Sequence, residues 1–282
     1  MSENTEILEF FSDLVYKEIG HIYNKDNLFG LSRRLESIAT QMGHSNIEEL
    51  YLAAKKGITP NLRLLLFDIA TNHETLFFRN PKLFNLIKEI VLPDLLKNPQ
   101  SRSLKVWSCA SSTGQEPYSL AILFEKNIPL VPGGVYEILA TDISPQVIEY
   151  GKKGIYSQLE VQRGLPFELL TEFFTKKDEG AMPNWEVASK LKSRIKFETL
   201  NLLHKWTLPK FSIIFCRNVL IYQNKESKKD IISRIHDSLI PGGYFVMGGS
   251  ESLFGLTNDF EQINKDNIMI FKKKEKSVKI AS

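Results

Sequence analysis

The stretch from Val106 to Ser119 constrains the fold of this chain more than any other part of the sequence. It reads VWSCASSTGQEPYS: the end of an apolar strand, a run of small residues with one glycine, and the start of a segment with helical apolar spacing. In an open α/β sheet, such a unit places the loop at the carboxyl edge, where backbone amides approach a nucleotide-like ligand. An ordinary β-to-α turn is an equal alternative, because Gly114 alone is a weaker signal than the three-glycine dinucleotide fingerprint.

The bulk composition narrows the class of protein. With 282 residues, 43% of them hydrophobic, the chain has enough apolar material for one large domain or two unequal ones. A net charge of +3 is too small to imply a nucleic-acid partner. The two cysteines, Cys109 and Cys216, form no metal-type pair, which favours a reduced, cytoplasmic compartment. The sequence has no basic-then-apolar leader and no apolar run of roughly 18 residues, so we expect neither secretion nor membrane spanning.

One short motif suggests a metal site and is rejected. His73 and Glu74 begin like the zinc-protease motif, but Phe77 stands where the second histidine is required. We therefore predict no metal site.

Residues 1 to about 72 are predicted to be all helix. Apolar residues recur at helical spacing in several segments, for example at Leu31, Leu35 and Ile38. The same segment carries Arg33 and Arg34 on its polar side. These arginines indicate either a solvated helix face or a surface that binds an acidic protein partner.

Two polar residues in predicted loop positions, Asp142 and Arg79, have open interpretations. Asp142 follows the predicted strand Val135–Thr141, where it could accept hydrogen bonds from both hydroxyls of a ribose or cap the helix after Ser144. Arg79 lies in an irregular segment, where it could bind a carboxylate through two hydrogen bonds or lie on the surface.

The second half of the chain continues the strand–helix alternation after an interruption. Residues 156–193 break the alternation and are predicted to form an inserted, small β-containing subdomain. Phe211–Phe215 is a largely apolar run, typical of a strand buried on both faces. The other predicted elements are strands Arg194–Glu198, Tyr244–Met247, Phe260–Ile263 and Ile268–Phe271, and a helix Glu226–Leu239 that stops at Pro241-Gly242-Gly243.

Five motifs follow one another along the chain: TNHETLFFR (71–79), STGQEPYS (112–119), TDIS (141–144), NLL (201–203) and FCRNVLIY (215–222). Taken together and in this order, they resemble the CheR-type chemotaxis receptor glutamate methyltransferases. The resemblance spans nearly the whole chain. It implies a seven-stranded class I S-adenosylmethionine-dependent methyltransferase fold of the Rossmann-like α/β type over residues 81–282, with the inserted β-subdomain within it. Residues 1–80 would form an all-helical N-terminal domain for receptor docking.

The resemblance also implies a function. The enzyme would transfer a methyl group from S-adenosylmethionine to side-chain glutamates of chemoreceptor cytoplasmic helices, giving glutamate methyl esters and S-adenosylhomocysteine during chemotaxis adaptation. Its partners would be those methylation helices, with no nucleic acid and with membrane contact only through the receptor. We expect a cytoplasmic monomer.

Residues are carried over position by position. The cofactor contacts implied are His73, Thr75, Arg79, Glu116, Asp142, Asn201, Leu202, Arg217 and Asn218. Arg79 and Tyr222 are assigned to the reacting centre, and Arg33 and Arg34 to steering of the acidic receptor surface. The sequence departs from the family at His73, where Asn is frequent, and at Gln115, where Glu is frequent.

The roles assigned to these residues are binding and orientation. Asp142 is expected to bind the ribose hydroxyls, Glu116 the charged methionine end, and Asn201 to lie near the adenine. Arg79 would hold a carboxylate of cofactor or substrate, and Arg217, Asn218 and Tyr222 would line the rim of the reacting centre. A glutamate with a reference pKa near 4.3 is already ionised, so no general base is required. Alignment and removal of water would supply the catalysis.

Three other functions are alternatives to receptor methylation. A cofactor-binding module without activity would keep the same pocket. A nicotinamide-dependent dehydrogenase is disfavoured because Gly114 stands without the other two fingerprint glycines. Methylation of a small molecule or nucleic acid is disfavoured mainly by the resemblance. The insertion is a second candidate docking element, through strand addition to an exposed edge.

Overall fold

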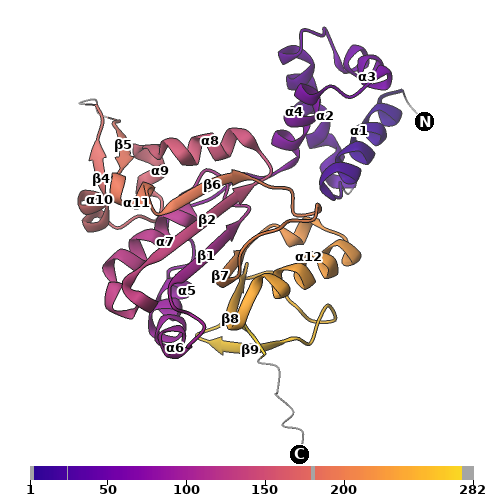
Figure 1. The fold of residues 1–282 in the computed structure, drawn as a ribbon. Helices are drawn as coiled ribbons and strands as arrows, with labels where there is room; N and C mark the ends of the chain where they lie inside the picture. Colours follow the sequence, from indigo (N-terminus) through magenta and orange to yellow (C-terminus); the bar gives the residue numbers. More distant parts are fainter. Residues whose placement is uncertain (1–2, 24, 179–181, 275–282) are drawn as a thin grey trace, which may run out of the picture.

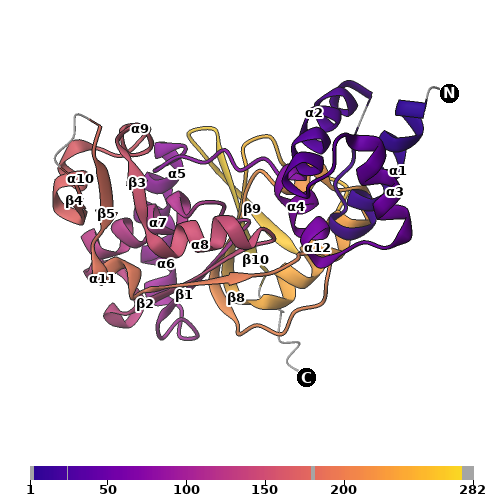
Figure 2. The same cartoon turned by 90° about the horizontal axis from the view of Figure 1, so that it is seen from above.

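The computed structural model describes residues 3–23, 25–178 and 182–274. Four helices gather at one end of the molecule, a twisted sheet with flanking helices occupies the middle, and a small second sheet lies at the opposite end from the N-terminal helices (Figure 1). Figure 2, seen from above, shows the same separation of the two ends.

The N-terminal region is helical, as predicted. Its helices are α1 (Glu3–Ile19), α2 (Lys25–Gln41), α3 (Ile47–Lys56) and α4 (Pro60–Ala70). The side chains of Asn46 and Thr59 cap α3 and α4 by accepting backbone N–H bonds from Glu49 and Leu62. The predicted apolar stripe of α2 is fully buried in a core that the four helices share. Burial of that stripe holds these short helices together.

The central sheet has seven strands in the order β6-β2-β1-β7-β8-β10-β9. The chain order reverses between β1 and β7, so the sheet has a switch point at their carboxyl ends. Strands β6, β2, β1, β7 and β8 pair in parallel, and β10 runs antiparallel to β8 and β9. The bounds are β1 (Leu104–Cys109), β2 (Tyr136–Asp142), β6 (Ile195–Thr199), β7 (Phe211–Cys216), β8 (Leu239–Met247), β9 (Phe260–Lys265) and β10 (Ile268–Lys273). This is the fold class that the resemblance implied.

Both faces of the sheet are covered. Along β7, Ile213 and Phe215 join one apolar cluster while Ile214 and Cys216 join another, because successive side chains of a strand point to opposite faces. All six residues of β7 are buried, as its largely apolar sequence predicted. The first cluster includes residues of α5 (Pro81–Leu86), the π-helical turn Ile87–Val91, α6 (Leu92–Lys97), α7 (Gln115–Lys126) and α8 (Pro145–Lys153). The second cluster packs against α12 (Lys225–Ser238).

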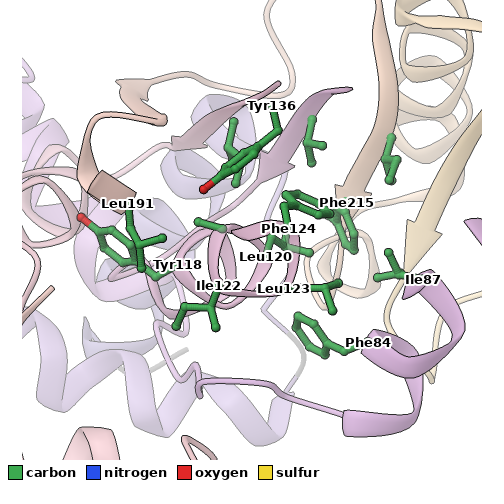
Figure 3. Packing of buried hydrophobic residues seen from close by; sticks show 14 of the residues in the cluster. Phe84, Ile87, Tyr118, Leu120, Ile122, Leu123, Phe124, Tyr136, Leu191 and Phe215 are labelled. Atoms are coloured by element: carbon green, nitrogen blue, oxygen red, sulfur yellow. The ribbon is translucent and has the colours of Figure 1, made fainter. Parts of the chain in front are cut away.

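Figure 3 shows the first cluster from close by. Leu120, Leu123 and Phe124 of α7 point into the same space as Phe84 and Phe215, which come from α5 and β7. This packing holds α7 against the sheet and α5. The loop before α7 therefore leads into a helix that is fixed on the sheet.

The boundary between α12 and β8 differs from the prediction. The helix ends at Ser238 and the strand begins at Leu239, so Pro241-Gly242-Gly243 lies inside β8. The pairing with β7 is irregular here, because Phe211 faces Leu239 whereas Ile213 faces Tyr244. A bulge of this kind tolerates the proline that a regular strand would exclude.

The predicted inserted β-subdomain is present. Its three strands pair antiparallel in the order β3-β5-β4. The elements are β3 (Ile155–Ser157), α9 (Gln158–Gln162), α10 (Phe167–Phe173), β4 (Phe174–Lys176), β5 (Asn184–Val187) and α11 (Ser189–Lys192). Short 3₁₀ turns elsewhere span Ile128–Leu130, Pro132–Gly134 and Leu220–Tyr222.

The segment 71–80 connects the helices to the sheet and packs with the latter. Phe77 is fully buried, and its ring lies 5.0 Å from that of Tyr156 and 5.6 Å from that of Phe174 in the insertion. The insertion approaches this segment so closely that a Cβ on Gly164 would lie 2.1 Å from the carbonyl oxygen of Phe77. These contacts pack the segment against the inserted subdomain. The end of the helical domain at residue 80 stays a prediction.

We predict that Gly164→Ala lowers the free energy of unfolding by at least about 2 kcal/mol, because it adds both a backbone clash and strain at a positive φ. Gly164 has a φ of +94°. The measurement is urea denaturation followed by circular dichroism. Gly30→Ala is the control: Gly30 lies inside α2 with open space around its Cβ position, so this substitution should stabilise by about 0.5–1 kcal/mol. Equal stability of the two variants would contradict the prediction.

Candidate functional site

A pocket opens at the carboxyl edge of the sheet, beside the switch point. It encloses about 1370 Å³ of empty space, including parts open to solvent, which is ample for a nucleoside-sized ligand. The pocket is lined from the end of α1, the segment 71–79 and the loops that follow β1, β2, β6 and β7. It contains all ten residues predicted to bind the cofactor or lie at the reacting centre: His73, Thr75, Arg79, Glu116, Asp142, Asn201, Leu202, Arg217, Asn218 and Tyr222.

The loop between β1 and α7 has an unusual backbone. Ala110, Ser112 and Gly114 all have positive φ, at 53°, 51° and 97°. For the two non-glycine residues this conformation costs of order 1 kcal/mol or more each, and surrounding contacts must hold it. Ser112 supplies them: its backbone N–H donates to Asp142 at 2.9 Å, and its hydroxyl donates to the carbonyl of His73 at 2.7 Å. The loop is therefore held in a shape that an ordinary β-to-α turn does not need.

Asp142 ends β2 and is 6% exposed. Its two oxygens accept backbone N–H bonds from Ser112 and Ser144. Burial raises the pKa of this carboxyl group, and the backbone donors oppose that shift. The helix-cap interpretation is wrong, because the side chain of Ser144 itself caps α8 by accepting from Val147. Asp142 lines the pocket and, as a carboxylate, has lone pairs to accept further hydrogen bonds.

Glu116 and Arg217 form a buried ion pair at 2.8 Å, with side chains 12% and 6% exposed. The hydroxyl of Ser108 donates to Glu116, and a second guanidinium nitrogen of Arg217 donates to the carbonyl of Arg79 at 2.9 Å. The Nε atom of Arg217 and the hydroxyl of Ser111 are buried and have no hydrogen-bond partner among the described residues. Buried polar atoms without partners are costly, so their location at this pocket indicates a polar ligand.

Glu251 is a site residue that the sequence analysis missed. Its carboxylate accepts backbone N–H bonds from Asn218 at 2.8 Å and Gly248 at 2.7 Å, and from Val219 and Ile221 at 3.2 Å each. Four donors on one carboxylate fix the loop that carries Arg217, Asn218 and Tyr222. Asn218 needs this support because its φ is +60°. An acid shortly after the Met247 end of a predicted strand was the available signal.

The end of α1 also contributes to the pocket, which the sequence analysis did not predict. Ile19 and His21 line it. Asn201 donates to the carbonyl of Glu18 at 2.9 Å, and its side-chain oxygen accepts the backbone N–H of Leu203. Both ends of the Asn201 side chain thus bond to protein backbone. Asn201 therefore has a structural role in the pocket wall, in addition to any contact with a ligand.

His73 connects the helical region to the sheet. Its Nε2 lies 3.3 Å from a carboxylate oxygen of Asp68 in α4, and Asp68 accepts the Ser144 hydroxyl at 3.0 Å. Burial alone would lower the pKa of His73, but the hydrogen bond of Asp68 and the charges of Asp142 and Asp68 outweigh it and raise the pKa. The same hydrogen bond is the main cause that lowers the pKa of Asp68, which burial opposes. The two residues therefore stabilise each other as an ion pair.

Arg33 and Arg34 are not on the pocket. Both are exposed on α2, and the guanidinium of Arg34 donates to the carbonyl of Ile69 in α4. Arg34 therefore joins two helices in addition to any role at the surface.

The described residues include neither a group of side chains that could hold a metal ion nor a helix that could cross a membrane. No group of three or more His, Cys, Asp or Glu side chains in residues 3–23, 25–178 and 182–274 is arranged to hold a metal ion. Among the helices of that same part of the chain, none is both long and apolar enough to cross a membrane.

Comparison with known proteins identifies relatives over the whole length. The family model "CheR methyltransferase, SAM binding domain" matches residues 73–269. Chemotaxis protein methyltransferase 1 of Pseudomonas aeruginosa is 37% identical over 281 residues, covering 97% of this chain and 100% of the relative. The chemotaxis protein methyltransferase of Vibrio parahaemolyticus is 35% identical over 267 residues, covering 94% and 95%. The solved N-methyltransferase NodS of Bradyrhizobium japonicum, in complex with S-adenosyl-l-homocysteine, is 13% identical with a TM-score of 0.41 and covers 72% of this chain and 90% of that chain, a likeness too low to carry an argument.

The sheet order, the family match and the pocket at the switch point define a class I S-adenosylmethionine-dependent methyltransferase. Family model and near-full-length relatives specify it further: the chain belongs to the CheR methyltransferase family. S-adenosylmethionine is its cofactor. The pocket fits this molecule, because Asp142 and Glu116 supply acceptors for its hydroxyl and ammonium groups and the unpartnered Nε of Arg217 is a donor for an anionic group.

We predict that Asp68→Asn destabilises the protein by about 1 kcal/mol near pH 5.5 and by less near pH 8.5. The Asp68 contribution is present above its ordinary pKa of 3.8 and is lost only as the pH falls through its lowered folded value. The His73 contribution is present below 6.5 and is lost as the pH rises through its raised folded value. The pair is therefore strongest between these limits.

Thermal denaturation at the two pH values measures this effect. Asp237→Asn is the matched control, because Asp237 also lies beside a histidine, His236 at 3.4 Å, but is 76% exposed. An exposed pair contributes little. An equal loss for Asp68→Asn at both pH values would show that the charge on His73 is not involved.

Proposed function

We propose that this methyltransferase transfers the methyl group of S-adenosylmethionine to side-chain glutamates on the cytoplasmic helices of chemoreceptors. The observation that carries the proposal is the pocket itself. It brings together a strand-end acid, a buried ion pair with an unpartnered donor, and two further polar residues at its rim, Arg79 and Tyr222. The names of the relatives, chemotaxis protein methyltransferases, support the choice of substrate.

The residues of the chain divide between the two substrates. S-adenosylmethionine supplies a methyl group bound to a positively charged sulfur. When the methyl group is transferred, the neutral thioether S-adenosylhomocysteine is a good leaving group. Asp142 would accept the ribose hydroxyls, and Glu116 would face the ammonium of the methionine end. Arg217 is held by Glu116 and would use its free Nε–H toward a carboxylate.

The acceptor needs orientation more than activation. A glutamate side chain is ionised at neutral pH and attacks without a general base. Arg79 and Tyr222 line the same pocket and would align its carboxylate, while the apolar neighbours Ile19 and Leu220 exclude water. The positive donor and negative acceptor give neutral products, so little charge develops that the protein must stabilise.

We predict that Asp142→Ala weakens binding of S-adenosylmethionine and S-adenosylhomocysteine by at least about tenfold, because two hydrogen bonds to a carboxylate are lost. The measurement is calorimetric titration, followed by a tritiated-methyl assay on receptor-containing membranes. Asp237→Ala, at an exposed carboxylate outside the pocket, is the control and should bind as the wild type does.

The outcomes separate the proposed function from its alternative. Base-labile label on the receptor with wild-type enzyme, and its loss in Asp142→Ala, supports glutamate methylation. Cofactor binding without label on any receptor preparation favours a binding module that only senses the cofactor. Undiminished binding by Asp142→Ala would overturn the assignment of this residue.

The partner surface is also proposed. Arg33 and Arg34 on α2 would steer docking onto the acidic face of the receptor helices. The inserted β-subdomain is a second candidate contact, through strand addition at an edge of its three-stranded sheet. The enzyme would act in the cytoplasm as a monomer and meet the membrane only through the receptor.

Reversal of charge at both arginines, Arg33→Glu with Arg34→Glu, should raise the apparent KM for receptor by about threefold or more and leave cofactor affinity unchanged. Arg33→Glu alone is measured as well, because a change at Arg34 also removes its bond to Ile69. Lys196→Glu on β6 is the control for Arg33→Glu, because it makes the same change of charge outside the helical region. An unchanged KM in both arginine variants would remove this assignment.

A further inference from the structure

We propose that His21 is a positioning residue, which holds the ring of Tyr222 in place at the pocket from the N-terminal helical region. The inference rests on the proposed function, because the part of Tyr222 in methyl transfer belongs to that proposal. His21 was not among the residues predicted from the sequence.

The two rings are stacked. Their centroids are 4.9 Å apart and their planes differ by 22°. The backbone N–H of Ile22 donates to the carbonyl of Tyr222 at 3.3 Å, which holds the two backbones together. Among the described residues, the Tyr222 hydroxyl forms no hydrogen bond. Ring stacking with His21 is therefore a contact that orients this side chain.

His21 also contacts a second tyrosine. The ring of Tyr23 lies 4.7 Å from the imidazole at an angle of 55°, so His21 has ring contacts with two tyrosines. Burial, together with the positive charge of Arg34 on α2, lowers the pKa of His21. The ring is therefore neutral at neutral pH, and it packs without adding a further positive charge beside the pocket.

The backbone that carries His21 is clamped by the loop that carries Tyr222. Gln223 donates from its side-chain amide to the carbonyl of Ile19 at 3.0 Å. Gly20, between Ile19 and His21, has a φ of +71°, and a Cβ there would lie 2.1 Å from the side-chain oxygen of Gln223. Glycine adopts this positive φ without strain. The chain thus turns sharply after α1 and delivers His21 to a fixed position.

This arrangement should affect the rate more than cofactor binding. In-line transfer depends on alignment of the reacting groups, and a small displacement of an aligning side chain is costly. Without His21, the Tyr222 ring has room to leave its position. A stacked aromatic pair contributes enough energy to change a rate by roughly two- to tenfold.

The test is a double-mutant cycle with His21→Ala, Tyr222→Ala and the combination. We expect His21→Ala to lower kcat by about fivefold while the affinity for S-adenosylhomocysteine stays within about twofold. His21→Phe, which keeps a flat ring, should restore most of the rate. The double variant should be no slower than Tyr222→Ala, because both changes act through one side chain. His44→Ala, a histidine of the helical region outside the pocket, is the control and should behave as the wild type.

A second measurement does not depend on activity. In protein labelled at tyrosine rings, the Tyr222 resonance, assigned with Tyr222→Phe, should shift in His21→Ala and return toward its wild-type position in His21→Phe. An unmoved resonance, a wild-type kcat in His21→Ala or fully additive losses in the cycle would each overturn the inference. Absence of methyl transfer by the wild type overturns the proposed function instead, and the resonance then still shows whether His21 holds the ring.

Discussion

The buried contact between Glu116 and Arg217 is the interaction on which the pocket depends. It joins the first turn of α7 to the end of β7, and through the carbonyl of Arg79 it also fixes the segment that leads from the helices to the sheet. Removing two charges from water is expensive, and such a pair is tolerated because additional hydrogen bonds, here from Ser108, satisfy it. Loss of either partner would leave a buried charge, at a cost of about 3–5 kcal/mol. This one ion pair therefore holds three separate segments together.

Much of the fold and of the candidate site could be predicted from the sequence, because the relevant signals are local. The apolar run Phe211–Phe215 identified a strand buried on both faces, and both residues of the ion pair, Glu116 and Arg217, lie inside short motifs. The role of Asp142 was ambiguous for a physical reason: a strand-end acid and a helix cap need the same residue type. The choice depended on whether Ser144 caps α8 itself, which is a matter of side-chain direction.

Other parts of the site could not be predicted, because they act through contacts between distant segments. Glu251 works through the backbone amides of a loop about thirty residues earlier, and amides carry no sequence signature. His21 acts by ring packing on Tyr222, far along the chain. The bulged start of β8 was missed because Pro241-Gly242-Gly243 is typical of a turn and only the pairing with β7 shows it to be part of a strand.

The bonds from Asn201 and Gln223 to the last carbonyls of α1 have a practical consequence. Sequence similarity to the cofactor-binding family model starts at residue 73, and a natural choice for a smaller protein would be to begin there. Such a fragment would lack one wall of its own binding site and would expose Leu203, which now lies beside Gly20 at the end of α1. Poor affinity or aggregation of that fragment would say nothing about the cofactor. A unit suited to ligand studies therefore keeps the helices before residue 73.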